Sequence, residues 1–209
     1  MSINLNGLYV ISDDNLTPKN TILTQIEEAL KGGATIIQLR DKISQDKEIE
    51  ELILNLQELC RKYNALFVLN DRVKLAIKLN CDGLHVGRSD HHRVEEIRKE
   101  YKGILGVSCY GDLQLAKSME DKGANYVAFG SFFPSSTKPN AAVVNKEVIK
   151  EAKEKLSIPV CVIGGITSKN ANILINEGAN MVAVISDIFK SKDIKQKCIE
   201  YNNIFKGKK

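Results

Sequence analysis

The chain has 209 residues, 43% of them hydrophobic and 27% charged, which is typical of a globular protein and too apolar for a disordered one. Thirty lysines and arginines against 26 aspartates and glutamates leave a net charge of +4, with no basic block inside the chain, so no nucleic acid is expected as a partner. Apolar runs fall far short of the roughly 20 residues that a membrane-spanning helix needs, so no membrane partner is expected.

Short apolar runs alternate with amphipathic segments along the whole chain. The continuous apolar, β-branched runs predict strands buried on both faces, at Leu8–Ser12, Thr35–Arg40, Leu66–Asn70, Gly83–Val86, Ile104–Ser108, Tyr126–Gly130, Pro159–Ile163 and Met181–Ser186. Apolar positions three and four residues apart predict helices between them, over residues 22–30, 49–59, 73–79, 94–101, 113–122, 146–155, 170–176 and 194–205. Gly33, Gly123 and Gly178 each stand where a helix should end before a strand begins.

This alternation predicts an α/β protein with a parallel sheet. The sheet can close into a (β/α)8 TIM barrel or stay open and doubly wound. The barrel is favoured, because an open sheet usually has fewer strands and often a glycine-rich turn after its first strand, where this chain has Asp13-Asp14-Asn15. No linker of glycine, serine and proline divides the sequence, so residues 1–209 are expected to form one domain, with flexible ends at 1–6 and 206–209.

The cysteines and the N-terminus indicate the compartment. The five cysteines form no C-x-x-C pair and their number is odd, which favours reduced thiols over disulfides or a zinc site. Residues Met1 to Asn6 have neither the basic nor the apolar part of a signal peptide. A cytoplasmic location is therefore expected.

Polar residues gather after the predicted strands, where the active site of such a barrel forms. Gln38, Arg40 and Lys42 lie on one face of the second strand, with Leu39 and Asp41 on the other, so the three would converge on the barrel mouth if Gln38 points inward. An exposed Arg-Asp-Lys turn is the alternative.

A second anion site is expected after the last strands. Gly164-Gly165 and Ser186 stand where this fold usually binds phosphate, although the glycine pair could be only a tight turn. The loop after the sixth strand adds hydroxyl donors and a cation, at Ser135, Ser136, Thr137 and Lys138.

Two carboxylates end neighbouring strands. Asp71 and Asp90, beside a basic anion site, suit Mg²⁺, which binds through one or two carboxylates plus substrate phosphates. Each could instead cap the helix that follows it. His85 lies within a strand, which indicates a wall residue, while His91 and His92 are expected to be exposed at the start of a helix. The residues alone thus indicate a phosphate-handling barrel enzyme with two anion sites and a divalent ion.

At these strand ends the sequence resembles the thiamine-phosphate synthase family, also called thiamine-phosphate pyrophosphorylase. The matching segments run from Gly7 to Phe189 and are GLYVISD, GGATIIQLRDK, FVLNDRVKLA, CDGLHVGRSD, GVSCYGD, GANYVAFGSFFPSSTKPNA, IPVCVIGGIT and GANMVAVISDIF. QLRDK, NDR and FFPSSTKP together are highly specific. The resemblance implies a (β/α)8 fold and a transferase that joins 4-amino-2-methyl-5-hydroxymethylpyrimidine diphosphate to a thiazole phosphate, giving thiamine phosphate and pyrophosphate.

The resemblance also implies roles for individual residues. The pyrimidine diphosphate would be held by Gln38, Leu39, Arg40, Asp41, Lys42, Asn70, Ser108 and Lys138, and the thiazole phosphate by Ser135, Ser136, Thr137, Gly165, Ile185 and Ser186. Asp71 and Asp90 would bind Mg²⁺. Arg40, Lys42, Ser108 and Lys138 would assist departure of pyrophosphate in a dissociative substitution.

The chain departs from the family at two places. Arg88 replaces a common glutamine, and its guanidinium could pair with Asp90 or reach the diphosphate. Cys109-Tyr110 replaces a common Thr-His, in a form that one branch of the family shares. Two other functions stay open: a thiazole tautomerase-like barrel, disfavoured by the complete diphosphate set, and a non-catalytic thiamine- or phosphate-binding module. The sequence leaves a homo-oligomer open.

Overall fold

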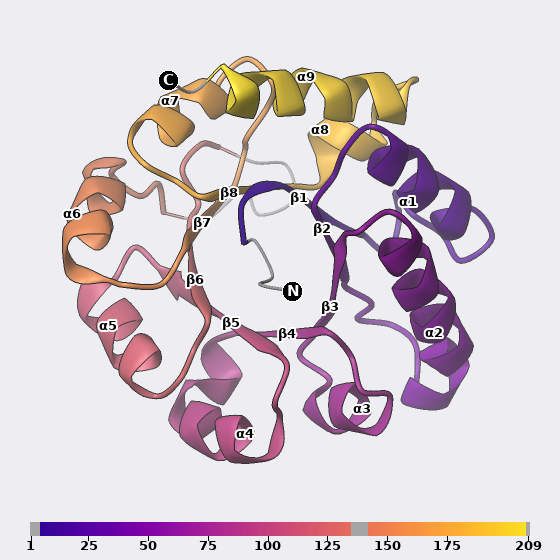
Figure 1. Ribbon diagram of the computed structural model, residues 1–209, viewed down its shortest axis with the longest axis horizontal. Coiled ribbons are helices and arrows are strands. Elements are labelled where there is room, and N and C mark those ends of the chain that lie inside the picture. Colours follow the sequence, from indigo (N-terminus) through magenta and orange to yellow (C-terminus); the bar gives the residue numbers. More distant parts are fainter. Residues whose placement is uncertain (1–4, 135–141, 208–209) are drawn as a thin grey trace.

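The computed structural model describes residues 5–134 and 142–207. In it, eight parallel strands close into a barrel with the helices outside (Figure 1). Each strand pairs with its neighbours in the chain, and β8 (Met181–Val184) pairs with β1 (Gly7–Ile11), with Val182 opposite Leu8. This last pairing leaves the sheet no open edge, so the predicted barrel is confirmed and the open sheet is excluded.

The elements follow the predicted order. The other strands are β2 (Ile36–Leu39), β3 (Leu66–Asn70), β4 (Gly83–Val86), β5 (Ile104–Tyr110), β6 (Tyr126–Phe129) and β7 (Val160–Ile163). The helices are α1 (Ile22–Lys31), α2 (Asp46–Lys62), α3 (Val73–Lys78), α4 (Val94–Glu100), α5 (Leu113–Asp121), α6 (Glu147–Lys155), α7 (Ala171–Asn176), α8 (Ser186–Phe189) and α9 (Ile194–Lys206), with a 3₁₀ helix, η1 (Arg88–Arg93), before α4. Gly33, Gly123 and Gly178 have φ of 90°, 93° and 113°, the left-handed conformation predicted for residues after a helix.

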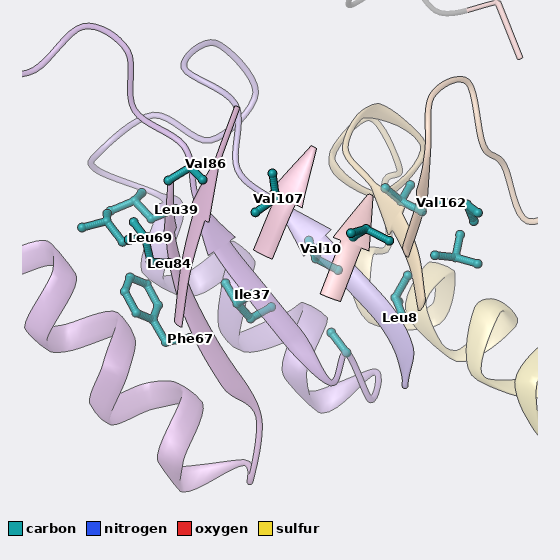
Figure 2. Close-up of a cluster of buried hydrophobic side chains, with 14 of the residues drawn as sticks. Leu8, Val10, Ile37, Leu39, Phe67, Leu69, Leu84, Val86, Val107 and Val162 are labelled. Carbon is teal, nitrogen blue, oxygen red and sulfur yellow. The ribbon is translucent and has the colours of Figure 1, made fainter. Parts of the chain in front are cut away.

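Alternating strand residues build two apolar layers. One set, including Leu8, Ile37, Phe67 and Val107, faces the helices and forms the main core (Figure 2). The other set fills the barrel interior, with Tyr9, Ile36, Val68, Tyr126, Ala128, Cys161 and Met181 among its members. Because both faces of every strand are buried, the strands have the continuous apolar character from which they were predicted.

Two short elements at the carboxyl ends of strands were not predicted. β8 ends at Val184, two positions before the predicted end, because Ile185 (φ −118°, ψ −81°) leaves the strand conformation and Ser186 begins α8. The 3₁₀ helix η1 follows β4 directly. Both elements place polar residues at the barrel mouth.

The chain ends are partly described. Leu5 is buried in the interior layer and α9 continues to Lys206, whereas residues 1–4 and 208–209 lie outside the described part of the structure. The domain bounds of 1–209 and the flexible ends stay predictions. Within the described ranges, no helix combines the length and the apolar character needed to cross a membrane.

Candidate active site

One group of predicted site residues meets where β2 and β3 end. Gln38 is buried, and its amide nitrogen donates to the Tyr9 hydroxyl at 2.6 Å, so the side chain points into the barrel. Lys42, on the same face four residues on, bonds through Nζ to the Oδ2 atom of Asp71. This ion pair joins the end of β2 to the end of β3, and 47% of the Lys42 side chain stays exposed.

The Asp71 backbone has a conformation that aspartate adopts only occasionally. Its φ is 63°, in the left-handed region, which costs a non-glycine residue on the order of 1–3 kcal/mol. Its N–H donates to the His85 carbonyl at 2.8 Å, which ties this turn to β4. Asp71 is not the N-cap of α3, because that position belongs to Arg72. The carboxylate therefore caps no helix; it pairs with Lys42, and 33% of the side chain is exposed.

The two other residues of the QLRDK segment turn away from the mouth. Leu39 is buried in the core beneath the helices. The Asp41 carboxylate accepts from the N–H groups of Ile43 (3.0 Å) and Ser44 (2.7 Å), and Arg72 lies 3.6 Å away. Burial raises the pKa of Asp41, but the Ser44 hydrogen bonds and Arg72 outweigh it and hold the pKa below its usual value. Asp41 thus stabilises the β2–α2 turn, and any substrate contact would have to come from its backbone.

The second predicted metal ligand lies on η1. The Asp90 side chain is 15% exposed, accepts from the Ser89 hydroxyl at 2.8 Å, and lies 3.8 Å from Arg93. Arg88 does not pair with it; its guanidinium lies over the Tyr110 ring, 4.6 Å from the centroid. Within residues 5–134 and 142–207, no three or more histidine, cysteine or acidic side chains are grouped to hold a metal ion.

A cavity of about 600 Å³ opens at the ends of β5 to β8. Four predicted residues line it: Ser108, Gly165, Ile185 and Ser186. Lys190 and Lys197 also line it, and neither was predicted, because they follow the last strand in segments that carry no motif. A space this size, lined by backbone groups, hydroxyls and cations, can accept a small anionic molecule.

Two glycines shape the floor of this cavity. Gly164 and Gly165 have φ of 106° and 63°, which side-chain-bearing residues rarely adopt. A Cβ on Gly165 would lie 2.4 Å from the Pro134 carbonyl oxygen and 2.5 Å from that of Phe133. The pair is therefore required for the close packing of the β6 and β7 loops, and it exposes backbone to the cavity.

His85 on β4 and Ser108 on β5 lie between the Lys42–Asp71 pair and the cavity, and their side chains bond to each other. His85 is buried in β4 as predicted, and its ring bonds to the Tyr126 hydroxyl (2.9 Å) and the Ser108 hydroxyl (2.8 Å). Burial lowers the pKa of His85 to about 4, with a smaller opposing effect from Asp71, so the ring is neutral near pH 7. His91 was expected to be exposed, but it is only partly so, because its Nε2 donates to the Ser108 carbonyl at 2.8 Å.

The remaining predicted residues are less constrained. Arg40 is anchored by its backbone N–H, which donates to Ser12 Oγ at 2.8 Å, and Asn70 ends β3 opposite His85. Ser135, Ser136, Thr137 and Lys138 lie outside the described residues.

The chain is similar to known proteins over nearly its whole length. Residues 8–188 match the family model described as thiamine monophosphate synthase. The thiamine-phosphate synthase of Nitrosococcus oceani is 40% identical over 207 residues, 98% of this chain and 95% of the relative; that of Wolinella succinogenes is 43% identical over 186 residues, covering 88% and 86%. The solved thiamine phosphate pyrophosphorylase of Pyrococcus furiosus aligns with a TM-score of 0.88 at 36% identity, covering 97% and 96% of the two chains. A barrel closed as β1–β8, a mouth carrying the QLRDK and NDR segments, and these relatives together show that the chain belongs to the thiamine-phosphate synthase family.

Proposed function

We propose that this enzyme, a transferase, joins 4-amino-2-methyl-5-hydroxymethylpyrimidine diphosphate to a thiazole phosphate, releasing pyrophosphate. The observation that carries the proposal is the division of the barrel mouth. The Lys42–Asp71 pair lies at the ends of β2 and β3, and the glycine-floored cavity lies at the ends of β5 to β8. Two anion sites on one rim match two anionic substrates.

The acidic residues suit Mg²⁺ as the accompanying ion. Asp71 and Asp90 are partly exposed carboxylates at the ends of neighbouring strands, and Mg²⁺ commonly takes one or two carboxylates and completes its shell with water and substrate phosphates. When bound, the ion would supply positive charge beside the diphosphate.

The chain's own groups would stabilise the leaving group. Lys42 lies at the end of β2 beside Asp71, and Ser108 presents a hydroxyl from β5. Arg40, which also follows β2, belongs to this set in the proposal. As the bond between the methylene carbon and the diphosphate oxygen breaks, negative charge grows on the diphosphate and positive charge on the methylene carbon. Donors already held in place stabilise that change without reorganising. Lys138 completes this set in the proposal, with Gln38 and Asn70 contacting the pyrimidine side and Leu39 and Asp41 contributing backbone groups.

The second substrate would be held by its phosphate in the cavity. Gly165, Ile185 and Ser186 line the space and leave backbone accessible, while Ser135, Ser136 and Thr137 complete the proposed clamp. Holding the thiazole beside the methylene carbon makes the attack effectively intramolecular. The thiazole nitrogen attacks with its lone pair and loses no proton, so no general base is needed, which agrees with the neutral, hydrogen-bonded state of His85.

Three further points concern the alternative function, the cellular location and the oligomeric state. A thiazole tautomerase-like function is not favoured, because the named relatives are thiamine-phosphate synthases. A cytoplasmic location is part of the proposal, supported by five unpaired cysteines. A homo-oligomer remains a proposal, which the mass in solution would test.

A pyrophosphate-release assay tests the proposal. Release should require both substrates together, and Lys42→Met should lower it by about 100-fold, comparable to loss of one oxyanion-type donor. Lys78→Met is the matched control, since Lys78 pairs with Glu50 between outer helices, and its rate should not change. Release with either substrate alone, or full activity of Lys42→Met, would overturn the assignment.

A further inference from the structure

A continuous chain of side-chain hydrogen bonds crosses the barrel interior and ends at the cavity. The Gln38 amide nitrogen bonds to the Tyr9 hydroxyl at 2.6 Å, and the Tyr9 and Tyr126 hydroxyls lie 2.9 Å apart. The Tyr126 hydroxyl bonds to His85 Nδ1 at 2.9 Å, and His85 Nε2 bonds to Ser108 Oγ at 2.8 Å. Five strands contribute one residue each, and we call these five residues the interior relay.

The donors and acceptors available in the relay determine which group donates in each of its hydrogen bonds. With Gln38 Nε2 turned toward Tyr9, as in this structure, the Tyr9 oxygen accepts from Gln38, and the Tyr9 proton goes to the Tyr126 oxygen, the other partner within reach. Tyr126 must then donate its proton to His85 Nδ1. The imidazole proton is consequently on Nε2, from which it is donated to Ser108 Oγ.

The opposite direction would leave buried groups without partners. If Tyr126 donated to Tyr9, the Tyr9 proton would face an amide N–H in a site where Tyr9 and Tyr126 are at most 1% exposed. A buried donor without an acceptor costs about 1–3 kcal/mol. Burial also holds the pKa of both tyrosines well above the usual value, so neither ionises to resolve the conflict.

We infer that Tyr9, Tyr126 and His85 are positioning residues that fix Ser108 as a hydrogen-bond donor to the diphosphate. Ser108 Oγ accepts from His85, which leaves the hydroxyl proton for a diphosphate oxygen at the edge of the cavity, where Ser108 lies between the two proposed anion sites. An anionic oxygen accepts such a proton, and the bond strengthens as charge grows on the leaving group. This inference rests on the proposed position of the diphosphate.

Kinetics of single and double variants test this inference. Tyr126→Phe removes the donor to His85 Nδ1, so the imidazole proton is no longer confined to Nε2 and Ser108 can turn its own proton toward the ring. We expect kcat to fall about 10-fold or more, with KM changed less than about twofold, because the lost bond is strongest in the transition state. Ser108→Ala should show a similar loss, and Tyr126→Phe should add nothing to it in the double variant.

Tyr101→Phe is the matched control. Tyr101 is also buried, but its hydroxyl donates to the Cys81 carbonyl at 2.7 Å in the layer beneath the helices, so its removal should leave kcat unchanged. Losses that multiply in the Tyr126→Phe/Ser108→Ala variant, or an unchanged kcat for Tyr126→Phe, would refute the inference.

The tautomer of His85 gives a readout that needs neither substrate nor activity. ¹⁵N NMR of the histidine-labelled wild-type protein, with His91→Gln and His92→Gln variants used for assignment, should show His85 protonated on Nε2 alone near pH 7. Protonation on Nδ1 would reverse the relay and overturn the inference, even if condensation activity is found. The predicted tautomer without condensation activity would instead place the fault in the proposed function.

Discussion

Replacing Gly165 with alanine tests the shape of the proposed phosphate cavity. At φ 63°, an alanine costs about 1–2 kcal/mol of backbone strain. Its Cβ would lie 2.4 Å from the Pro134 carbonyl oxygen, and relieving such a contact typically costs about 1–3 kcal/mol. The lower entropy of the unfolded alanine chain offsets about 0.5 kcal/mol of this. The expected loss in free energy of unfolding is therefore about 1.5–4.5 kcal/mol.

Gly87→Ala is the matched stability control. Gly87 has φ −110°, and a Cβ there would meet nothing within 4 Å. This variant should be as stable as the wild type or more stable by about 0.4–1 kcal/mol. Urea unfolding gives both free energies. In the folded fraction of Gly165→Ala, KM for the thiazole phosphate should rise by about 10-fold, comparable to one hydrogen bond to a charged group. Equal stability of the two variants with an unchanged KM would refute this account of the glycine pair.

Three further outcomes are expected. Asp71→Asn should lower turnover by about 100-fold, and EDTA should stop the wild-type reaction until Mg²⁺ is added back; activity that persists in EDTA would contradict the metal assignment. The pKa of Asp41 is lower in the folded than in the unfolded state, so its contribution to stability is present above about pH 4 and is lost as pH falls through the folded-state pKa. Asp41→Asn should therefore reduce the free energy of unfolding at pH 7 and cost less at pH 3, and an equal cost at both would exclude this linkage. All five cysteines are buried, and burial raises the pKa of Cys60 to about 12. A thiol reagent should therefore react slowly with the native protein and should label all five thiols after unfolding. Fast labelling of the native protein would contradict this burial.

The barrel could be predicted from the sequence because each of its strands is marked by a pattern of neighbouring residues. Each strand is a continuous apolar run, and residues such as Leu8 and Phe67 face the helices while Tyr9 and Val68 face the interior. Alternation along β2 likewise predicted that Gln38, Arg40 and Lys42 share one face, and in the structure Gln38 points inward. Predicting these features requires only the two-residue period of a strand and the burial of both faces of a parallel sheet.

The missed features depend on closure of the barrel or on very short elements. Tyr9 and Tyr126 are 117 positions apart, and their hydroxyls meet only inside the closed sheet, so strand patterns treat both as apolar residues. The helix α8 has four residues, too few to show a helical period, which is why β8 was predicted to run on to Ser186. The role of Arg88 could not be predicted from the sequence. Its guanidinium lies over the ring of Tyr110, at a register shift in the pairing of β5 with β6 that strand patterns do not reveal.

Direct detection of product is the most decisive measurement. Purified protein incubated with the pyrimidine diphosphate, the thiazole phosphate and Mg²⁺ should form thiamine phosphate and pyrophosphate in equal amounts, as followed by mass spectrometry and phosphate analysis. Omission of any one component should abolish both products. Binding of either substrate without formation of thiamine phosphate, under conditions where the protein is folded, would contradict the account.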